Sequence, residues 1–422
     1  MFEHGLSVPV LTPQPLPKSP STVITAEAGL NLSPQMELRV EPLVQPGDRV
    51  AQGAPILKDR RRPECVITAP MSGHIAELEI GPGRRLTSLI IYREDNGDRH
   101  AYDIRAANTE ISGAAGASAL RTLLQVSGLW MRLRARPFGT VPAPEASPAA
   151  LFVMAVDTRP LAPDPRVTLG GENEGWLALG LNALGQLCDG PVYFCQDRGP
   201  DILPLEKQIR RLRVGPLHPT GLAGFQIHRH FPARLGRSVW EIGAEDVVAI
   251  GHLLSTGHLP ATRLVGVAGP GLRETLLVRC QPGADLRELC YAHMKPGQQA
   301  ILSGSVLEGS EARWLGFHDR QVTVIERRQP KSRNHWLETA LRRAARAEPI
   351  IATAAVEQAL GGAFAGMALL RALSVGDDEM ASDLGVLSLL EEDMALLDYV
   401  TAASPRFSDL LRAALNRIEA NI

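Results

Sequence analysis

The side chains best suited to ligand chemistry lie in two segments around a predicted buried strand. The apolar run at 151–156 predicts a buried parallel strand, and Pro160 must end it. Ligands of open α/β sheets sit outside the carboxyl ends of the strands, which places Asp157 at a potential ligand site. Further aromatic groups and hydrogen-bond donors follow in segments 130–138 and 214–233. The candidate site residues are Arg136, Phe138, Asp157, His218, Phe225 and His228.

Metal chemistry has little support in the sequence. His228 and His230 alternate, so they would share one face of a strand, but no third ligand is in reach. The cysteines are Cys65, Cys188, Cys195, Cys280 and Cys290. No pair has C-x-x-C spacing, which argues against a zinc ribbon or an iron–sulfur run, and the odd, scattered set indicates reduced thiols in the cytoplasm. We therefore predict no metal site on this chain.

Composition limits the function classes further. At 422 residues the chain has room for two to four domains. A net charge of −2 and an aromatic content of 5% give neither the basic surface nor the stacking area that nucleic-acid binding needs. The first ten residues lack a basic flank and a long apolar core, so no signal peptide is expected, and no uncharged apolar stretch predicts a membrane span.

The N-terminal region predicts short strands and tight turns after a proline-rich arm. Segments 40–57 and 66–92 form a loose repeat, and Pro46-Gly47 and Pro82-Gly83 suit type II turns. This pattern is similar to the barrel-sandwich domain of lipoyl and biotinyl carriers. The corresponding hairpin tip, 60–63, has no lysine to modify, which favours a docking module over a swinging-arm carrier.

The remainder predicts an α/β domain, a small β-grasp unit and a helical tail. Helical patterns at 115–126 and 173–187 surround the central strand, and 192–195 predicts the next parallel strand of a βαβ unit. A helix over 245–254 precedes the β-grasp-like stretch, and an arginine-rich helix is expected at 337–347. The predicted fold is α/β multidomain, with a lipoyl-like barrel-sandwich, a Rossmann-like, an SLBB-like β-grasp and a helical domain. Their predicted boundaries are 1–105, 106–258, 259–330 and 331–422.

Segment 127–165 carries a resemblance to known proteins. It resembles the flavin-site segment of the family that includes the C subunit of the Rnf complex and the FMN subunit of complex I. Those relatives have a glycine-rich GGAGFPT-type loop, where this chain has Trp-Met-Arg-Leu-Arg-Ala-Arg at 130–136. Of the pattern in those relatives, this chain retains only Gly128, the Arg136-Pro-Phe138 corner and Pro142. The GLW…LRxRPF pattern is similar to the A-subunit family of the Na⁺-translocating NADH:quinone oxidoreductase (Nqr).

Two further segments agree with that resemblance. Segment 219–224 is Pro-Thr-Gly-Leu-Ala-Gly and lacks the acidic residues that flavin-binding relatives have there. Segment 391–405 keeps the Glu-Glu…Val…Pro frame of the Rnf C tail but none of its cluster-binding cysteines. Close backbone approach to a phosphate needs glycines, and an iron–sulfur cluster needs thiolates. Trp130, Arg132 and Arg134 are expected to block the phosphate, so the resemblance implies that this chain binds no cofactor.

The resemblance implies a peripheral subunit of a Na⁺-translocating NADH:quinone reductase, with flavins and iron–sulfur centres on partner subunits. The complex would oxidise NADH, reduce ubiquinone and export Na⁺ from the cytoplasmic face of a bacterial inner membrane, and this chain alone would not be catalytic. It would dock on the other Nqr subunits, especially the membrane-embedded ones. The emptied flavin cleft, with the six candidate residues, is a candidate quinone headgroup site.

Two alternatives from other classes stay open at this stage. A flavin-dependent NADH dehydrogenase subunit of the Rnf or complex I type would need the glycine loop that is missing. A non-catalytic docking adaptor would fit the same fold. Neighbouring genes for the other Nqr subunits would separate the adaptor from the respiratory subunit.

Overall fold

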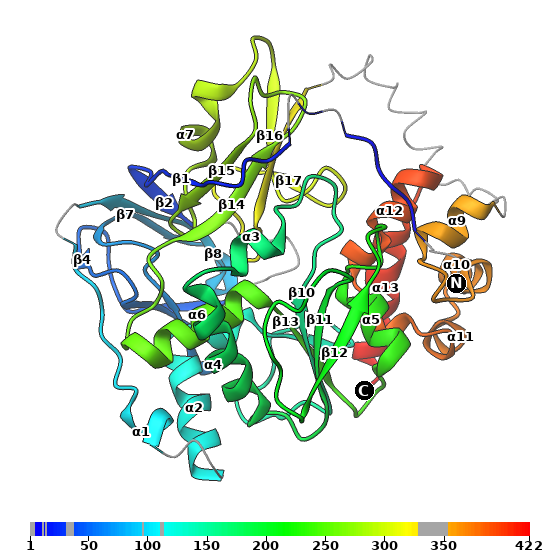
Figure 1. The fold of residues 1–422 in the computed structure, drawn as a ribbon, viewed down its shortest axis with the longest axis horizontal. Coiled ribbons are helices and arrows are strands. Elements are labelled where there is room, and N and C mark those ends of the chain that lie inside the picture. The colour runs from blue at the N-terminus through cyan, green and yellow to red at the C-terminus, as the bar shows by residue number, and fades with distance from the viewer. Residues whose placement is uncertain are drawn as a thin grey trace.

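The computed structural model packs four parts against one another (Figure 1). They are an N-terminal β region, a central mostly parallel sheet with helices on both faces, a second mixed sheet, and a C-terminal group of helices. The residues that the structure describes are 5–10, 12, 15–30, 38–94, 97–109, 114–327 and 353–422. The arginine-rich helix expected at 337–347 therefore lies outside the described residues.

The N-terminal β region consists of two small antiparallel sheets that share a core. Its strands are β2 (Glu27–Gly29), β3 (Val40–Pro42), β4 (Arg49–Val50), β5 (Pro55–Asp59), β6 (Arg62–Thr68), β7 (Gly73–Ile80) and β8 (Leu86–Arg93). The β5–β6 hairpin turns at Arg60–Arg61, where the tip was predicted. Gly47 and Gly83 have φ of 93° and 70°, as the predicted Pro-Gly turns require.

The central sheet has the order β12-β11-β10-β13-β9. Four strands are parallel, namely β10 (Ala150–Ala155), β11 (Val192–Asp197), β12 (Ile209–Val214) and β13 (Val239–Gly243), while β9 (Arg134–Arg136) is an antiparallel edge. The predicted strand at 151–156 is confirmed. Its side chains alternate, with Leu151 and Val153 in one hydrophobic core and Phe152 in another.

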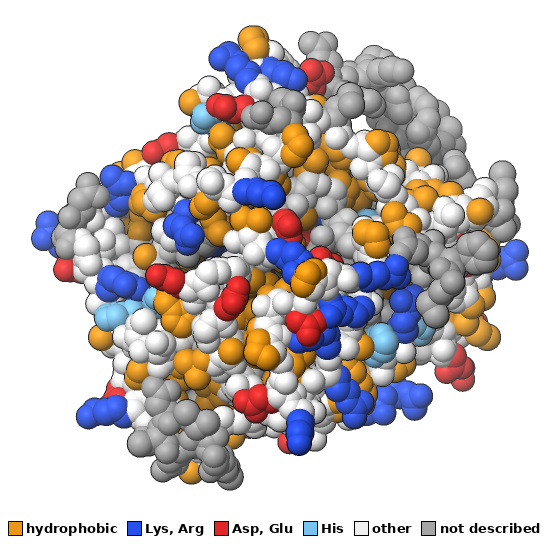
Figure 2. Space-filling view, in the orientation of Figure 1, with side chains coloured by type: hydrophobic (Ala, Val, Ile, Leu, Met, Phe, Trp, Pro, Cys, Tyr) orange, Lys and Arg blue, Asp and Glu red, His pale blue; other side chains and the backbone are white. Residues whose placement is uncertain are grey.

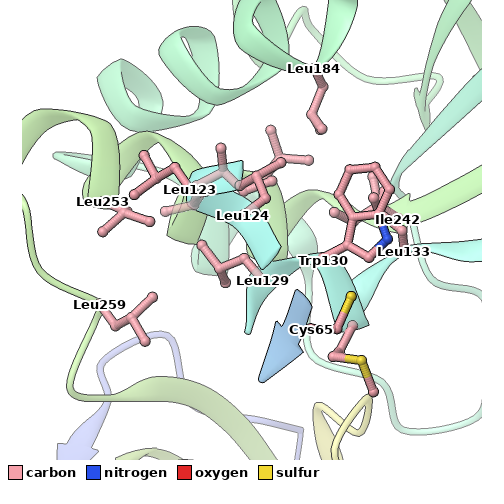
Figure 3. Packing of buried hydrophobic residues seen from close by; sticks show 14 of the residues in the cluster. Cys65, Leu123, Leu124, Leu129, Trp130, Leu133, Leu184, Ile242, Leu253 and Leu259 are labelled. Atoms are coloured by element: carbon pink, nitrogen blue, oxygen red, sulfur yellow. The ribbon is translucent and has the colours of Figure 1, made fainter. Parts of the chain in front are cut away.

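Helices α4 (Asn173–Gly185) and α6 (Ala244–Thr256) cover one face of this sheet. Helix α2 (Ala114–Val126) leads through the 3₁₀ turn η2 (Leu129–Arg132) into β9. Trp130 is fully buried, donates from Nε1 to the Pro142 carbonyl at 3.0 Å, and lies near Leu133 and Ile242 (Figure 3). The expectation that Trp130 blocks the cleft is wrong, because its indole fills the core instead.

The opposite face of the sheet is covered by α5 (Ala223–His230) and the C-terminal helices. Those helices are α9 (Ala354–Ala359), α10 (Gly366–Val375), α11 (Asp378–Asp383), α12 (Glu391–Thr401) and α13 (Phe407–Ala420). The interpretation that His228 and His230 share one face of a strand is wrong, because both lie on the helix α5, and two alternating residues are too few to establish a strand. Gly361 and Gly362 form a turn with φ near 58° after α9.

The second sheet joins a strand of the N-terminal arm to strands that follow α6. Its order is β1 (Ser21–Thr22), β15 (Leu276–Cys280), β14 (Arg263–Ala268), β18 (Gln321–Glu326), β16 (Gln299–Ser303) and β17 (Ser310–Glu311). The short helix α7 (Leu286–Cys290) is capped by Asp285, whose carboxylate accepts from the Arg287 amide at 2.8 Å. The remaining short helices are α1 (Arg105–Thr109) and α3 (Pro165–Leu169).

The proline-rich N-terminal arm is extended and crosses several parts of the molecule. The Leu6 amide donates to the His218 carbonyl at 2.7 Å, and β1 pairs with β15 in parallel. The arm then enters the N-terminal β region at β2, which pairs with β8. Among the described residues, no helix is long and apolar enough to cross a membrane.

The crossing of α4 and α6 gives a first testable prediction. A Cβ atom on Gly180 would lie 2.2 Å from the Val247 carbonyl oxygen, so the two helix backbones leave no room for a side chain. Gly180→Ala should lower the free energy of unfolding by about 1–3 kcal/mol, measured by urea denaturation. Gly175→Ala is the matched control in the same helix. It meets no atom within 4 Å and should leave stability unchanged or slightly raised.

Candidate functional site

The cleft predicted from the sequence lies where the chain order reverses between β10 and β13. Asp157 follows β10, Gly243 ends β13, and Gly221 approaches from the loop before α5. A cavity of about 170 Å³ remains there. That volume is below the range of roughly 300–1,000 Å³ that is usual for small-molecule pockets.

Charged side chains fill most of this cleft. Arg134 contacts Glu241 at 2.6 Å and forms a bidentate pair with Glu392 at 2.7 and 2.9 Å. Arg136, which is fully buried, donates to Glu241 at 2.9 Å and lies 3.5 Å from Asp393. Two arginines from β9 thus meet one carboxylate of β13 and two carboxylates of α12. This network joins the sheet to the C-terminal helices.

The network shifts its two α12 carboxyl groups in opposite directions. Although burial opposes it, the charge of Arg134 holds the pKa of Glu392 well below its ordinary value. Burial raises the pKa of Asp393 to about 7, with Arg136 only partly offsetting that effect. Asp393 also accepts from the Leu390 amide at 2.8 Å, which places it at the first turn of α12. We infer that Glu392, rather than Asp393, provides the negative charge that α12 places opposite the β9 arginines.

A second group of charges closes the other wall of the cavity. Arg159 pairs with Asp157 at 2.9 Å and with Glu308 at 2.8 Å. Burial raises the pKa of Glu308, and likewise that of Asp319, which accepts from Ser303 at 2.5 Å. Seven carboxyl groups and four guanidinium groups line the cavity. Because the carboxyl groups outnumber the guanidinium groups, charge pairing only partly compensates the carboxyl groups for their loss of contact with water.

The predicted site residues do not converge on this cavity, because of the six only Asp157 lines it. Phe138 and Phe225 belong to the core under the C-terminal helices, where Phe225 meets Phe364 edge-to-face at 5.6 Å. His228 stacks on the same Phe364 ring at 4.0 Å, and burial lowers its pKa. These three side chains are therefore covered by the C-terminal helices.

His218 has a local role in the loop before α5. It is 3% exposed, and its Nδ1 lies 3.3 Å from the Thr158 hydroxyl. Burial, and then the charge of Arg159, lowers its pKa to about 4, so the ring is neutral at pH 7. The Thr158 hydroxyl also accepts from the Gly221 amide at 3.0 Å. His218 and Thr158 thus hold the loop against the end of β10.

A larger cavity of about 570 Å³ lies at the junction of the N-terminal β region, the central domain and the second sheet. We call it the junction cavity. Its apolar walls come from all three parts and include Ile67, Leu129, Trp176, Val248, Leu264 and Phe317. Trp176 packs edge-to-face on His252 at 4.6 Å, and the His252 Nδ1 is 2.9 Å from the His258 carbonyl. This volume is within the usual range for a small-molecule site.

A wall of charged residues lies between the junction cavity and the cleft, and Arg132, Asp246 and Arg320 line both. Asp246 lies 2.6 Å from Arg320 and 3.7 Å from both Arg132 and Arg263. Despite burial, the charges of Arg320 and Arg132 keep the pKa of Asp246 below its ordinary value. Because three guanidinium groups share one carboxylate, they retain N–H donors for another acceptor. Arg132 also lies over the Phe317 ring at 3.5 Å.

Family comparisons agree with this architecture. The model of the NqrA N-terminal barrel-sandwich hybrid domain matches residues 2–94, that of the NqrA second alpha/beta domain matches 115–259, and that of the NQRA C-terminal domain matches 264–313. The A subunit of the Na⁺-translocating NADH-quinone reductase of Pseudomonas aeruginosa strain UCBPP-PA14 is 36% identical over 411 residues, 89% of each chain. The chain belongs to the NqrA family.

Other members of the NqrA family align over nearly the whole chain. The corresponding protein of Pasteurella multocida strain Pm70 is 34% identical over 455 aligned positions, 99% of each chain. A solved structure, an NAD⁺-reducing [NiFe]-hydrogenase in the air-oxidized state, aligns with a TM-score of 0.38 and 12% identity over 75% of this chain and 65% of that one. That level of likeness does not establish a common fold.

The NqrA match confirms a barrel-sandwich N-terminal domain, a second α/β domain and a C-terminal SLBB domain. The predicted boundaries at 105, 258 and 330 stay predictions. Among the described residues, no three His, Cys, Asp or Glu side chains are grouped to hold a metal ion. Sequence reasoning missed the junction cavity, because its walls come from three separate regions and no local motif marks them.

The ion network gives a second prediction. Glu392→Gln should lower the free energy of unfolding at pH 7 by about 3 kcal/mol, because it leaves Arg134 with less compensation in a buried site. The folded-state pKa of Glu392 is depressed, so its stabilising effect is present above about pH 4.5 and is lost as the pH falls below that value. Urea denaturation at pH 7 and pH 4 measures both effects.

Asp378→Asn is the matched control for that variant. Asp378 pairs with Arg417 at 2.6 Å on the surface, where an ion pair contributes less than about 1 kcal/mol. An equal loss of stability in both variants, or a deficit of Glu392→Gln that grows toward pH 4, would contradict the assigned role of the network.

Proposed function

We propose that this chain is the peripheral A subunit of a Na⁺-translocating NADH:quinone reductase, bound to the cytoplasmic side of membrane-embedded partner subunits. The observation that carries the proposal is the near full-length similarity to proteins with that name. NADH oxidation, quinone reduction and Na⁺ export belong to the assembled complex. The chain itself supplies docking surfaces and a ligand cavity. In this interpretation its central domain is a Rossmann-like unit and its first domain a lipoyl-like one.

Co-purification tests this assignment to the reductase. A tagged version of the chain, expressed in its own host and extracted in mild detergent, should bring the membrane subunits of the reductase with it in equal amounts. Mass spectrometry of the eluate identifies them. Recovery of the chain alone from membranes that retain NADH:quinone reductase activity would favour a separate adaptor function.

The chain is proposed to bind no flavin. Arg134 and Glu392 occupy the volume beside the strand ends, and the remaining cavity of about 170 Å³ is too small for a flavin ring system. Backbone amides that would contact a phosphate are also missing, since the η2 turn and β9 replace a glycine-rich loop.

Absorbance of the purified chain checks this proposal. The pure protein should be colourless, with no flavin band near 450 nm (roughly where oxidised flavins absorb) and no broad iron–sulfur absorbance. Added FMN should not be retained after gel filtration. Stoichiometric flavin in the protein as purified would contradict the assignment, and would revive the Rnf or complex I type of function.

The quinone headgroup site is proposed in the junction cavity rather than in the cleft. A quinone presents an apolar ring and two carbonyl acceptors. Trp176, Leu264 and Phe317 offer apolar contact, and Arg132 and Arg263 have N–H donors beyond those that Asp246 occupies. With Nδ1–H directed to the His258 carbonyl, His252 presents Nε2 as an acceptor for a quinol hydroxyl.

Photo-crosslinking with an azido-quinone should label peptides within 127–132 and 248–264. The substitution Ala249→Phe places a larger side chain in the cavity and should reduce this labelling at least fivefold. The thermal unfolding midpoint of this variant verifies that it folds. Labels confined to Asp157 and 219–230 would instead support the cleft. An absence of labelling on the chain within the complex would assign quinone binding to its partners.

A further inference from the structure

Four arginines form a surface region that contains no acidic partner in the described part of the chain. They are Arg210 on β12, Arg229 on α5, and Arg234 and Arg237 in the turn before β13. We call this region the arginine face. Arg229 donates to the Gly361 carbonyl at 3.3 Å, and Arg237 to that of Pro232 at 3.0 Å, so neither is neutralised by a carboxylate.

Aromatic rings connect these arginines into one continuous region. The Arg210 guanidinium lies 5.9 Å from the Tyr193 ring, which in turn is 6.2 Å from the His230 ring. The Arg237 guanidinium lies 4.6 Å from the centre of the ring of Phe231, the next residue. A backbone bridge joins Arg237 to Arg234. Figure 2 shows Lys and Arg side chains gathered over β12 and α5.

Asp201 and Glu206, in the segment before β12, make their contacts with residues outside the arginine face. Asp201 pairs with both Arg211 and Arg213, and Glu206 accepts from Asn182 and Gln208 at 2.7 and 2.6 Å. The chain as a whole has a net charge of −2, so the positive region does not follow from composition. Uncompensated positive charge on a nearly neutral protein indicates attraction to an anionic partner.

An exposed leucine at the centre of the turn identifies the kind of partner. Leu235 is 47% exposed and lies between Arg234 and Arg237. Gly236, with φ of 73°, gives the turn its shape, and a Cβ atom there would meet no atom within 4 Å, so the turn projects into solvent. An apolar side chain at the tip of a turn, flanked by arginines and near Tyr and Phe rings, suits the interface of a lipid bilayer.

We propose that the arginine face binds the surface of an anionic phospholipid bilayer, with Leu235 entering the boundary between headgroups and acyl chains. Guanidinium groups bind phosphate oxygens through paired hydrogen bonds. The contact goes beyond the proposed function: it orients the protein on the membrane independently of its protein partners. An acidic protein segment would use the same arginines but gives Leu235 no apolar environment, and this difference separates the two partners.

Vesicle co-sedimentation of the full-length chain tests the proposal. The wild type should bind vesicles with 30% phosphatidylglycerol in phosphatidylcholine, bind pure phosphatidylcholine weakly, and dissociate as NaCl is raised. Arg210→Gln/Arg234→Gln should weaken binding roughly twentyfold, since each arginine at an anionic surface contributes about a factor of five. Leu235→Ser should weaken it about tenfold through the lost apolar contact. Circular dichroism verifies that the variants fold.

Matched controls carry the same chemical changes elsewhere on the surface. Arg60→Gln/Arg61→Gln alters two exposed arginines at the β5–β6 hairpin tip, and Val375→Ser alters a side chain that is 79% exposed. Both should bind vesicles like the wild type. Equal weakening in the controls, equal binding of the wild type to neutral vesicles, or no vesicle binding at all would overturn the proposal. Variants that bind vesicles normally but lose the membrane subunits would instead assign the face to a protein partner.

Discussion

A fully buried arginine must be compensated, and this requirement determines how the C-terminal half of the molecule is assembled. Arg136 has no exposure to water, and the carboxylates near it come from both β13 and α12. Removing such a cation from water costs several kcal/mol unless charge and hydrogen bonds replace the solvent. The C-terminal helices are therefore held to the sheet by an obligatory contact as well as by the apolar core around Phe225 and Phe364.

The same network makes two residues that are far apart in the sequence depend on each other. Arg134 belongs to β9, and Glu392 belongs to the first turn of α12. In this structure the two residues form a bidentate pair across 258 positions of sequence. A glycine at 134 would leave Glu392 without its bidentate partner, and a neutral residue at 392 would leave Arg134 with Glu241 alone. Arg134 and Glu392 thus stabilise each other in this buried site.

Periodicity in the sequence identified much of the fold. The apolar run around Phe152 and the helical spacing of Leu177, Leu181 and Leu184 reflect burial on one side of an element, and that information is local. The alternation of His228 and His230 was too short to distinguish a strand from a helix. The contact of the β9 arginines with α12 could not be derived, because it depends on how distant parts of the chain pack. The junction cavity was missed for the same reason, since Trp176 and Phe317 meet only in the folded molecule.

The position of the N-terminal arm has a consequence for the order of folding. Strand β1 pairs with β15, and Thr25 and Gln281 exchange hydrogen bonds across 256 residues. During synthesis on the ribosome, β1 therefore has no partner strand until about two thirds of the chain has emerged. The apolar strand β15 forms its edge pairing only when β1, which is synthesised near the start of the chain, packs against it. At roughly 5–20 residues per second, that interval lasts on the order of tens of seconds, during which the arm must stay extended and unaggregated. Its prolines, which cannot donate to a competing β ladder, suit that waiting period.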